Sequence, residues 1–270
     1  MAKGEESSKS SVFEKIVPAL VVLSIGLAFM VGVLWQKVSG LEKGGATAAG
    51  AQQAAAQPAA TKVTMDMIKD VYSKDLVKFG DKNKKLLFVE VGDPSCPYCH
   101  VAGGDNPELA AQVGTQFKYV SDGGSYVAPV AEMKKLVESG KAAYAYVYYP
   151  GHGNGEMGTK ALYCAFDQGK FWEAHDLVYS NKGYELLNNV VKNDKTQTSK
   201  MVDFLAKVVD GGKLKECIDS GKYDKRLSDE QALGLTLGVQ GTPGFFLNDT
   251  SFPGAYNWTD MKPIADAALK

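Results

Sequence analysis

A strand that runs directly into two closely spaced cysteines constrains the fold of this chain more than any other feature. The run Leu86–Val91 is apolar except for Glu90, which is typical of a central strand buried on both faces. Cys96 and Cys99 follow within a few residues. Pro97 suits the first position of a helix, because its ring fixes φ and its missing N–H breaks no helical hydrogen bond. The sequence therefore predicts Cys96 at a helix N-terminus and Cys99 one turn inside.

Two kinds of site use a Cys-x-x-Cys pair, namely thiol–disulfide exchange and one half of a zinc site. The free N–H groups and the dipole at a helix N-terminus stabilise a thiolate and lower its pKa. We therefore expect Cys96 to be the nucleophile, with a pKa below the usual value of about 8.5, and Cys99 to be the buried resolving thiol. The spacings of the four cysteines fit no zinc motif, so we expect no metal.

The surroundings of the cysteine pair resemble the thioredoxin superfamily. An acid, Glu90, stands six residues before Cys96, and Thr242-Pro243 precedes another apolar run that ends at Leu247. Within this superfamily, residues 63–270 are similar to the DsbA-like thiol:disulfide oxidoreductases. The resemblance implies an α/β thioredoxin-like fold with an inserted helical domain at about residues 155–222, and no cofactor.

The resemblance also implies roles for the site residues. Cys96 and Cys99 would exchange disulfides with substrates, and Glu90 would be a buried acid that relays protons to and from Cys99. A strand residue whose carboxylate reaches the surface is the alternative for Glu90. Thr242 would offer its backbone to a bound peptide beside a cis Pro243, and the alternative is a trans proline that starts a strand.

Three further residues belong to the motif by position: Pro97, Tyr98 and His100. We expect His100 at the surface or at the helix end. The alternative is that its positive charge favours the nearby thiolate. We interpret His152 and His175 as structural.

Two other cysteines, Cys164 and Cys217, lie on apolar helical stripes of the expected insertion. We expect them to form a structural disulfide, which would contribute about 4 kcal/mol in the chain-entropy model. Two buried free thiols are the alternative. An even number of cysteines suits an oxidising compartment.

The N-terminal part of the chain has a different composition. Ile16–Trp35 contains twenty residues without a charge, about 30 Å as a helix. We expect a transmembrane helix at residues 16–36 after a cytoplasmic segment at 1–15. A cleaved signal peptide is the alternative, but its apolar region is normally about 7–15 residues long. The Ala-, Gly- and Gln-rich residues 37–62 are expected to be a flexible linker to a domain on the periplasmic or extracellular side.

Apolar periodicity predicts the remaining elements. Residues 116–130 depart from the usual family pattern and form either a loop beside the active site or a surface insertion, and we favour the surface insertion. The other expectations are a helix from Met65 towards Gly80, a strand over Ala142–Tyr149, a capping box at Ser228–Gln231, a last strand within Ser251–Tyr256, and a final helix capped by Thr259.

A net charge of −1 gives no reason to expect nucleic acid as a partner. The expected function therefore rests mainly on the resemblance. The resemblance implies a membrane-tethered thiol:disulfide oxidoreductase that donates the Cys96–Cys99 disulfide to thiol-containing proteins and is reoxidised by a membrane redox partner. A reductase or isomerase, or a metal- or peptide-binding module, is the alternative. A linker replaces the dimerisation domain of isomerase relatives, which favours a monomer.

Overall fold

The computed structural model describes residues 62–270. The predicted cytoplasmic segment, the transmembrane helix at residues 16–36 and nearly all of the predicted linker lie outside the described residues. Among residues 62–270, no helix is both long and apolar enough to cross a bilayer.

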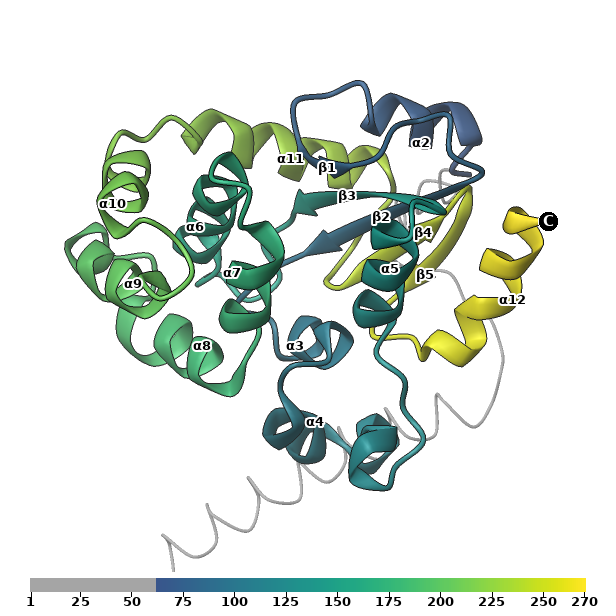
Figure 1. Ribbon diagram of the computed structural model, residues 1–270, viewed down its shortest axis with the longest axis horizontal. Helices are drawn as coiled ribbons and strands as arrows, with labels where there is room; N and C mark the ends of the chain where they lie inside the picture. The colour runs from purple at the N-terminus through teal and green to yellow at the C-terminus, as the bar shows by residue number, and fades with distance from the viewer. Residues whose placement is uncertain (1–61) are drawn as a thin grey trace, which may run out of the picture. The chain divides into compact units, whose positions relative to one another are not determined.

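A five-stranded mixed sheet with the order β1-β3-β2-β4-β5 forms the centre of the described part (Figure 1). β2 and β3 run parallel, with Glu90 opposite Tyr146, and the other neighbouring pairs are antiparallel. The strands are β1 (Val77–Phe79), β2 (Leu86–Gly92), β3 (Ala142–Tyr148), β4 (Gly244–Leu247) and β5 (Thr250–Pro253).

Helices surround this sheet, and short helical turns connect several of them. The turns are the 3-10 turns η1 (Thr115–Phe117), η2 (Val120–Asp122) and η4 (Lys195–Gln197) and the π-helical turn η3 (Leu186–Val191). The helices are α2 (Met65–Val71), α3 (Pro97–Gly103), α4 (Pro107–Val113), α5 (Pro129–Glu138), α6 (Glu156–Asp167), α7 (Phe171–Val178), α8 (Asn181–Glu185), α9 (Thr198–Leu205), α10 (Gly211–Asp219), α11 (Asp224–Thr236) and α12 (Trp258–Leu269).

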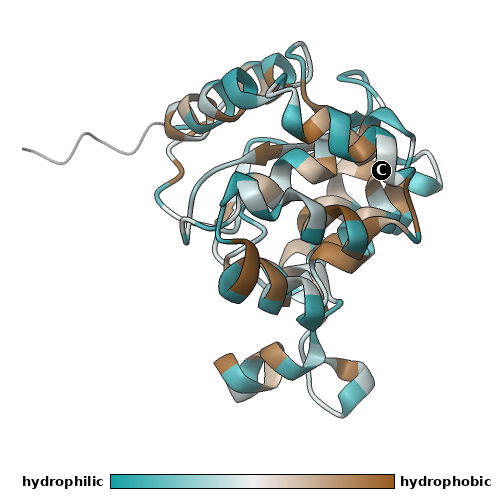
Figure 2. Ribbon diagram, turned by 90° about the vertical axis from the view of Figure 1, so that its left-hand side faces the viewer, coloured by the Kyte–Doolittle hydropathy of each residue, from teal (hydrophilic) through white to brown (hydrophobic). Residues whose placement is uncertain are grey.

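Helices cover both faces of the sheet, so all residues of β2 and β3 are buried. α2 and α11 pack on one face, and α5 and α12 pack on the other. Because side chains alternate along a strand, the tyrosines of β3 face the α5 side, whereas Ala143, Ala145 and Val147 face the α2 side. Figure 2 shows hydrophobic and hydrophilic residues alternating along the helices, as expected when one face of each helix is buried.

The predicted helical insertion is confirmed, and it comprises α6 to α10 between β3 and α11 (Figure 1). A disulfide joins Cys164 of α6 to Cys217 of α10, with a Cα–Cα distance of 5.9 Å. The predicted structural disulfide is therefore confirmed, and the alternative of two free thiols is wrong.

The expected opening helix is too long. α2 ends at Val71, and Val77–Phe79 forms β1, which pairs with Tyr144–Tyr146 of β3. Apolar residues at these positions fit either structure, and pairing with the sheet decides between them. Gly80, with φ of +76°, ends the strand.

Two predicted helix starts are also wrong. Ser228 lies inside α11, where its hydroxyl donates to the carbonyl of Lys225, so it caps nothing. α12 is capped by Asn257, whose Oδ1 accepts from the N–H of Thr259. The predicted last strand is present as β5, but it ends earlier, at Pro253.

Candidate active site

Cys96 is the N-cap residue of α3, and Pro97 occupies the first helical position, as predicted. The carbonyl of Cys96 accepts from the N–H of Cys99 at 3.1 Å and from that of His100 at 3.3 Å. Both cysteines of the pair are free thiols and are buried, with exposed fractions of 1% for Cys96 and 0% for Cys99. Exposure therefore does not distinguish the two sulfur atoms.

Their pKa values do distinguish them. The pKa of Cys96 is lowered to about 6, chiefly by a hydrogen bond from the Cys99 thiol. Burial opposes this shift, whereas the N–H groups of Cys99 and Tyr98 add to it. Burial raises the pKa of Cys99 well above its usual range, and the neighbouring Cys96 raises it further. At neutral pH, Cys96 is a thiolate and Cys99 a protonated thiol.

The loop before β4 lies directly against Cys96. The Thr242–Pro243 peptide bond is cis, as predicted, and Cys96 Sγ lies 3.3 Å from the carbonyl oxygen of Thr242. Among residues 62–270, the buried Thr242 Oγ1 has no hydrogen-bond partner. A Cβ at Gly151 would lie 1.9 Å from this oxygen, so the contact requires a glycine. The cis-proline loop therefore packs between the cysteine helix and the loop after β3.

Glu90 is the buried acid that the sequence predicts, with an exposed fraction of 0%, and the alternative of a carboxylate at the surface is wrong. Burial raises its pKa, while His175 and the Tyr144 hydroxyl lower it in part. Glu90 Oε2 accepts from the Tyr144 hydroxyl at 2.7 Å, whereas Oε1 has no partner among the described residues. Its proton-relay role stays a prediction.

Two tyrosines that the sequence analysis missed lie near both Glu90 and the cysteines. The hydroxyl oxygens of Tyr146 and Tyr179 are 3.2 Å apart. A Cβ at Gly92 would lie 3.2 Å from Glu90 Oε1 and 3.4 Å from the Tyr179 oxygen, so these two oxygens border one small space. Burial raises the pKa of both tyrosines, and the charges of Glu90 and Cys99 raise it further. Tyr146 could have been noticed in the sequence, because tyrosines alternate along β3.

His100 lies in the last turn of α3, as one part of the expectation had it, but it is not at the surface. Its side chain is fully buried, with Nδ1 2.8 Å from the carbonyl oxygen of Tyr179 and Nε2 2.7 Å from that of Pro94. Burial lowers the pKa of His100 to about 4, against the raising effect of both carbonyls. The ring is neutral at pH 7, so the alternative, a positive charge that favours the thiolate, is wrong as well.

Asp93 organises the turn before the cysteines, and the sequence analysis missed it. Its carboxylate accepts from the N–H and hydroxyl of Ser95 and from the N–H groups of Gly151 and His152, all at 2.7–2.8 Å. The N–H of Asp93 donates to Cys99 Sγ at 3.5 Å. An aspartate two residues before a serine is a turn signal that could have been found. Asp93 therefore fastens the loop after β3 to the cysteine turn.

Residues 116–130 lie beside the cysteine helix, so the favoured interpretation as a surface insertion is wrong. The ring of Phe117 packs edge-on against that of Tyr98, with centroids 5.7 Å apart. The Tyr119 hydroxyl donates to the carbonyl of Val101 at 3.0 Å. Aromatic residues of this segment form a small core with α3, which fixes the segment next to the motif.

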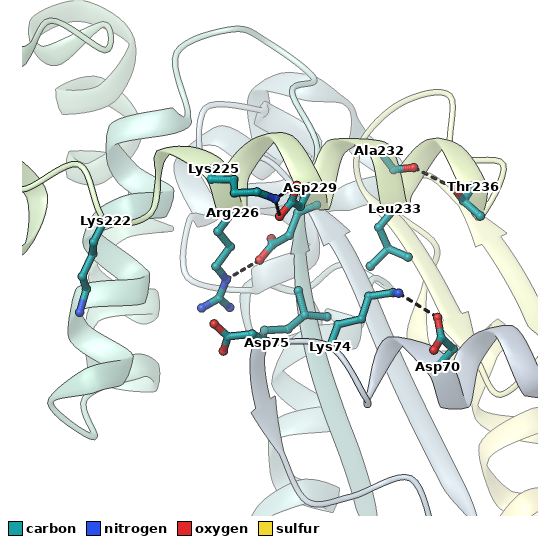
Figure 3. Close-up of a pocket in the computed structure, with 12 residues that line it drawn as sticks. Asp70, Lys74, Asp75, Lys222, Lys225, Arg226, Asp229, Ala232, Leu233 and Thr236 are labelled. Atoms are coloured by element: carbon teal, nitrogen blue, oxygen red, sulfur yellow. Dashed lines mark hydrogen bonds and ion pairs between the residues drawn. The ribbon is translucent and has the colours of Figure 1, made fainter.

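A hollow of about 620 Å³ lies away from the cysteines, between α2 and α11, and Figure 3 shows its charged lining. Most of its charges form pairs within the lining: Lys74 with Asp70, Lys225 with Asp229 and Arg226 with Glu230. No cysteine of the described residues lines it. Because its charges balance and its lining residues are distant in sequence from the cysteine motif, we assign no redox chemistry to this hollow.

Comparison with known proteins gives one family match and a shared fold. Residues 129–267 match the model of a thioredoxin family. Oxidised BdbD from Bacillus subtilis superposes with a TM-score of 0.51 at 15% identity, covering 77% of this chain and 96% of that one. For α-DsbA1 from Wolbachia pipientis, the TM-score is 0.52 at 17% identity, with coverage of 72% and 91%. These likenesses establish the fold.

Curated relatives include two proteins described as Na(+)/H(+) antiporters NhaA. The one from Herminiimonas arsenicoxydans is 21% identical over 192 residues, which is 71% of this chain and 25% of that protein. The one from Salinispora arenicola is 24% identical over 194 residues, 70% of this chain and 24% of that protein. The chain thus spans about a quarter of the length of the curated relatives it matches.

Proposed function

Because the chain belongs to the thioredoxin family, we propose that it is a thiol:disulfide oxidoreductase that acts through Cys96 and Cys99. One observation carries the proposal: two buried thiols, one turn apart, have pKa values shifted in opposite directions beside a cis-proline loop. Opposite pKa shifts have no function in a purely structural pair of thiols. In disulfide exchange they make one thiol the nucleophile and leaving group and keep the other protonated.

The reaction begins from the oxidised form, in which Cys96 and Cys99 share a disulfide. A substrate thiolate attacks Cys96 Sγ, a mixed disulfide forms, and Cys99 leaves and takes up a proton. A second substrate thiolate then attacks the substrate sulfur of the mixed disulfide and releases Cys96 as a thiolate. The substrate loses two electrons and gains a disulfide, and the enzyme gains two electrons and ends as the dithiol.

The pKa of Cys96 supports donation of disulfides over reduction. A thiolate with a pKa of about 6 is a good leaving group, and its stability favours the reduced enzyme. A reduced form stabilised in this way makes its disulfide a stronger oxidant. Reductase or isomerase activity is the second candidate, because the motif alone does not set the direction.

Glu90 and the tyrosine pair complete the proposed proton chemistry. Cys99 needs a proton when the disulfide opens and must release it when the disulfide closes. A buried carboxyl whose pKa is raised by burial can take up this proton and release it again. The hydroxyls of Tyr146 and Tyr179 lie close to Glu90 and can pass the proton on towards Cys99.

We further propose that the protein works outside the cytoplasm on thiol-containing proteins, tethered by residues 16–36 and reoxidised by a membrane redox partner. The uncharged length of Ile16–Trp35 supports the tether, and the Cys164–Cys217 disulfide suits an oxidising compartment. Protease treatment of cells freed of any outer membrane tests the topology. Cleavage within residues 63–270 is expected, and complete protection would contradict an external domain.

Turnover of a reduced peptide with two cysteines tests the enzymatic proposal. The oxidised full-length protein should convert it to the disulfide in the presence of a chemical oxidant, and Cys96→Ser should not. When the Cys96 thiolate of Cys99→Ser attacks the disulfide of an oxidised single-cysteine peptide dimer, one peptide thiol leaves and a mixed disulfide should accumulate, because no Cys99 thiol is present to release Cys96. A binding module would hold the peptide without forming its disulfide, and that result would overturn the proposal.

A further inference from the structure

A second cluster of polar groups lies where the cysteine helix meets the inserted domain. Asp105 follows α3, and His175 and Asp176 belong to α7. One oxygen or nitrogen atom from each residue lies within 4.8 Å of the others. All three line a hollow of about 290 Å³. We propose that they form a binding site for a divalent first-row transition-metal ion.

His175 provides the observation that sets this cluster apart from ordinary surface acids. Its side chain has an exposed fraction of 1%, and neither ring nitrogen has a hydrogen-bond partner within residues 62–270. A buried polar group without a partner is unfavourable, so an unpaired imidazole points to a missing ligand. Its Nδ1 lies 3.7 Å from Asp176 Oδ1, on the side of the cluster.

Packing holds the imidazole in this orientation. The ring of His175 stacks on that of Tyr179, with centroids 4.1 Å apart and an angle of 16° between the planes. The rings of Trp172 and Phe171 pack against it at 5.6 and 5.7 Å. A ligand fixed by its neighbours loses little conformational freedom when it binds a metal, which favours affinity.

The ligand set selects the kind of ion. One imidazole nitrogen with two carboxylate oxygens suits zinc and its neighbours, which accept mixed nitrogen and oxygen ligands. Calcium and magnesium prefer oxygen alone, and copper(I) prefers sulfur. Three protein ligands leave at least one position of a tetrahedral ion for water. The ion would also connect the end of α3 to the inserted domain through Asp105 and His175.

Two lysines line the same hollow and oppose a cation, of which Lys135 is paired with Glu132 and Lys134 with Asp176. The Lys134 ammonium lies 2.8 Å from Asp176 Oδ2, whereas Oδ1 faces His175. The ion can therefore take Oδ1 while Lys134 keeps Oδ2, at the expense of repulsion between two positive charges. Removal of this charge should tighten binding.

Titration with Co²⁺ and Zn²⁺ tests the site in the untagged, oxidised full-length protein, whose closed Cys96–Cys99 disulfide offers no thiolate to the metal. We expect one equivalent of Co²⁺ to bind with ligand-field absorption, Zn²⁺ to displace it, and Zn²⁺ to raise the melting temperature. Asp105→Asn should weaken binding by at least about tenfold and remove the thermal shift. Asp266→Asn, an exposed aspartate on α12, is the matched control and should change neither.

His175→Phe keeps the aromatic packing and should abolish binding, and Lys134→Met should tighten it by roughly threefold or more. If His175→Phe does not fold, Asp105→Asn decides, because its side chain is exposed. Binding that does not saturate, or that is equal in Asp105→Asn and in the control, would overturn the proposal, as would weaker binding in Lys134→Met. The readout involves no turnover, so it is independent of the proposed redox function.

Discussion

The two cysteine pairs of this protein differ in the feature that decides what a pair of sulfurs does. Cys164 and Cys217 are 53 residues apart, belong to two helices and are joined in a disulfide that ties α6 to α10. Cys96 and Cys99 share one helical turn and are free, with pKa values shifted in opposite directions. Burial is common to the redox pair and to Cys164, so burial does not decide the role. The position at a helix N-terminus and the neighbouring hydrogen-bond donors do.

Among substitutions in the two cysteine pairs and at Glu90, Cys96→Ser should have the largest effect on turnover. Turnover of the two-cysteine peptide should fall by roughly a thousandfold or more, because the attacked sulfur is gone. Urea unfolding should show a stable protein, since serine is close in size to cysteine. Substantial turnover by the folded variant would remove the distinction between the two pairs.

Replacing the other pair should have the opposite consequence. Cys164→Ala combined with Cys217→Ala should lower the free energy of unfolding by about 2–5 kcal/mol. Turnover per folded molecule should stay near that of the parent protein, measured at a temperature where both are folded. A loss of turnover as large as that of Cys96→Ser would assign the second disulfide to the reaction.

The pH dependence of stability should distinguish reduced from oxidised protein. The Cys96 thiol has a pKa lowered to about 6, so it stabilises the reduced fold above its unfolded pKa of about 8.5, and this stability is lost as the pH falls through 6. Reduced protein should therefore gain stability relative to Cys96→Ser between pH 6 and pH 8. Urea unfolding at several pH values measures this gain. The oxidised protein is the control and should show none of it.

Glu90→Gln should have a smaller effect, confined to the redox pair. Turnover should fall by roughly tenfold to a hundredfold, because glutamine does not exchange a proton. The fold should persist, since one oxygen of Glu90 has no partner in the described part of the chain.

Glu230→Gln is the matched control for Glu90. This equally buried carboxylate accepts from Arg226 at 2.7 Å and from the N–H of Tyr148 at 2.6 Å. Glutamine keeps one acceptor oxygen but removes the counter-charge of the buried Arg226 guanidinium, so stability should fall while turnover per folded molecule stays. Equal losses of turnover in both variants would contradict the assignment of Glu90 to proton transfer.

The local parts of the site could be predicted from the sequence, because their causes are local. Pro97 sets the start of the helix, an apolar run sets the strand that carries Glu90, and a short motif marks Pro243. These features depend on neighbours within a few residues. The helical insertion was predictable for the same reason, since apolar spacing repeats within each of its helices.

The parts that failed depend on contacts between distant segments. His100 is buried because Tyr179, 79 residues later, covers it, and no local pattern reports that contact. Asp93 accepts from N–H groups 58 and 59 residues away. Val77 lies in a stretch with helical spacing but forms a strand, because it pairs with β3. In each case tertiary pairing outweighs the local preference.

Ionisation of the redox pair tests the account most directly. The ultraviolet absorbance of a thiolate, taken as the difference between reduced and oxidised full-length protein across pH, reports it without any need for reagent access. We predict one step with a midpoint near pH 6 that disappears in Cys96→Ser, because Cys96 alone ionises in this range. A midpoint near the usual thiol pKa of about 8.5, or a step near pH 6 that persists in Cys96→Ser, would contradict the account.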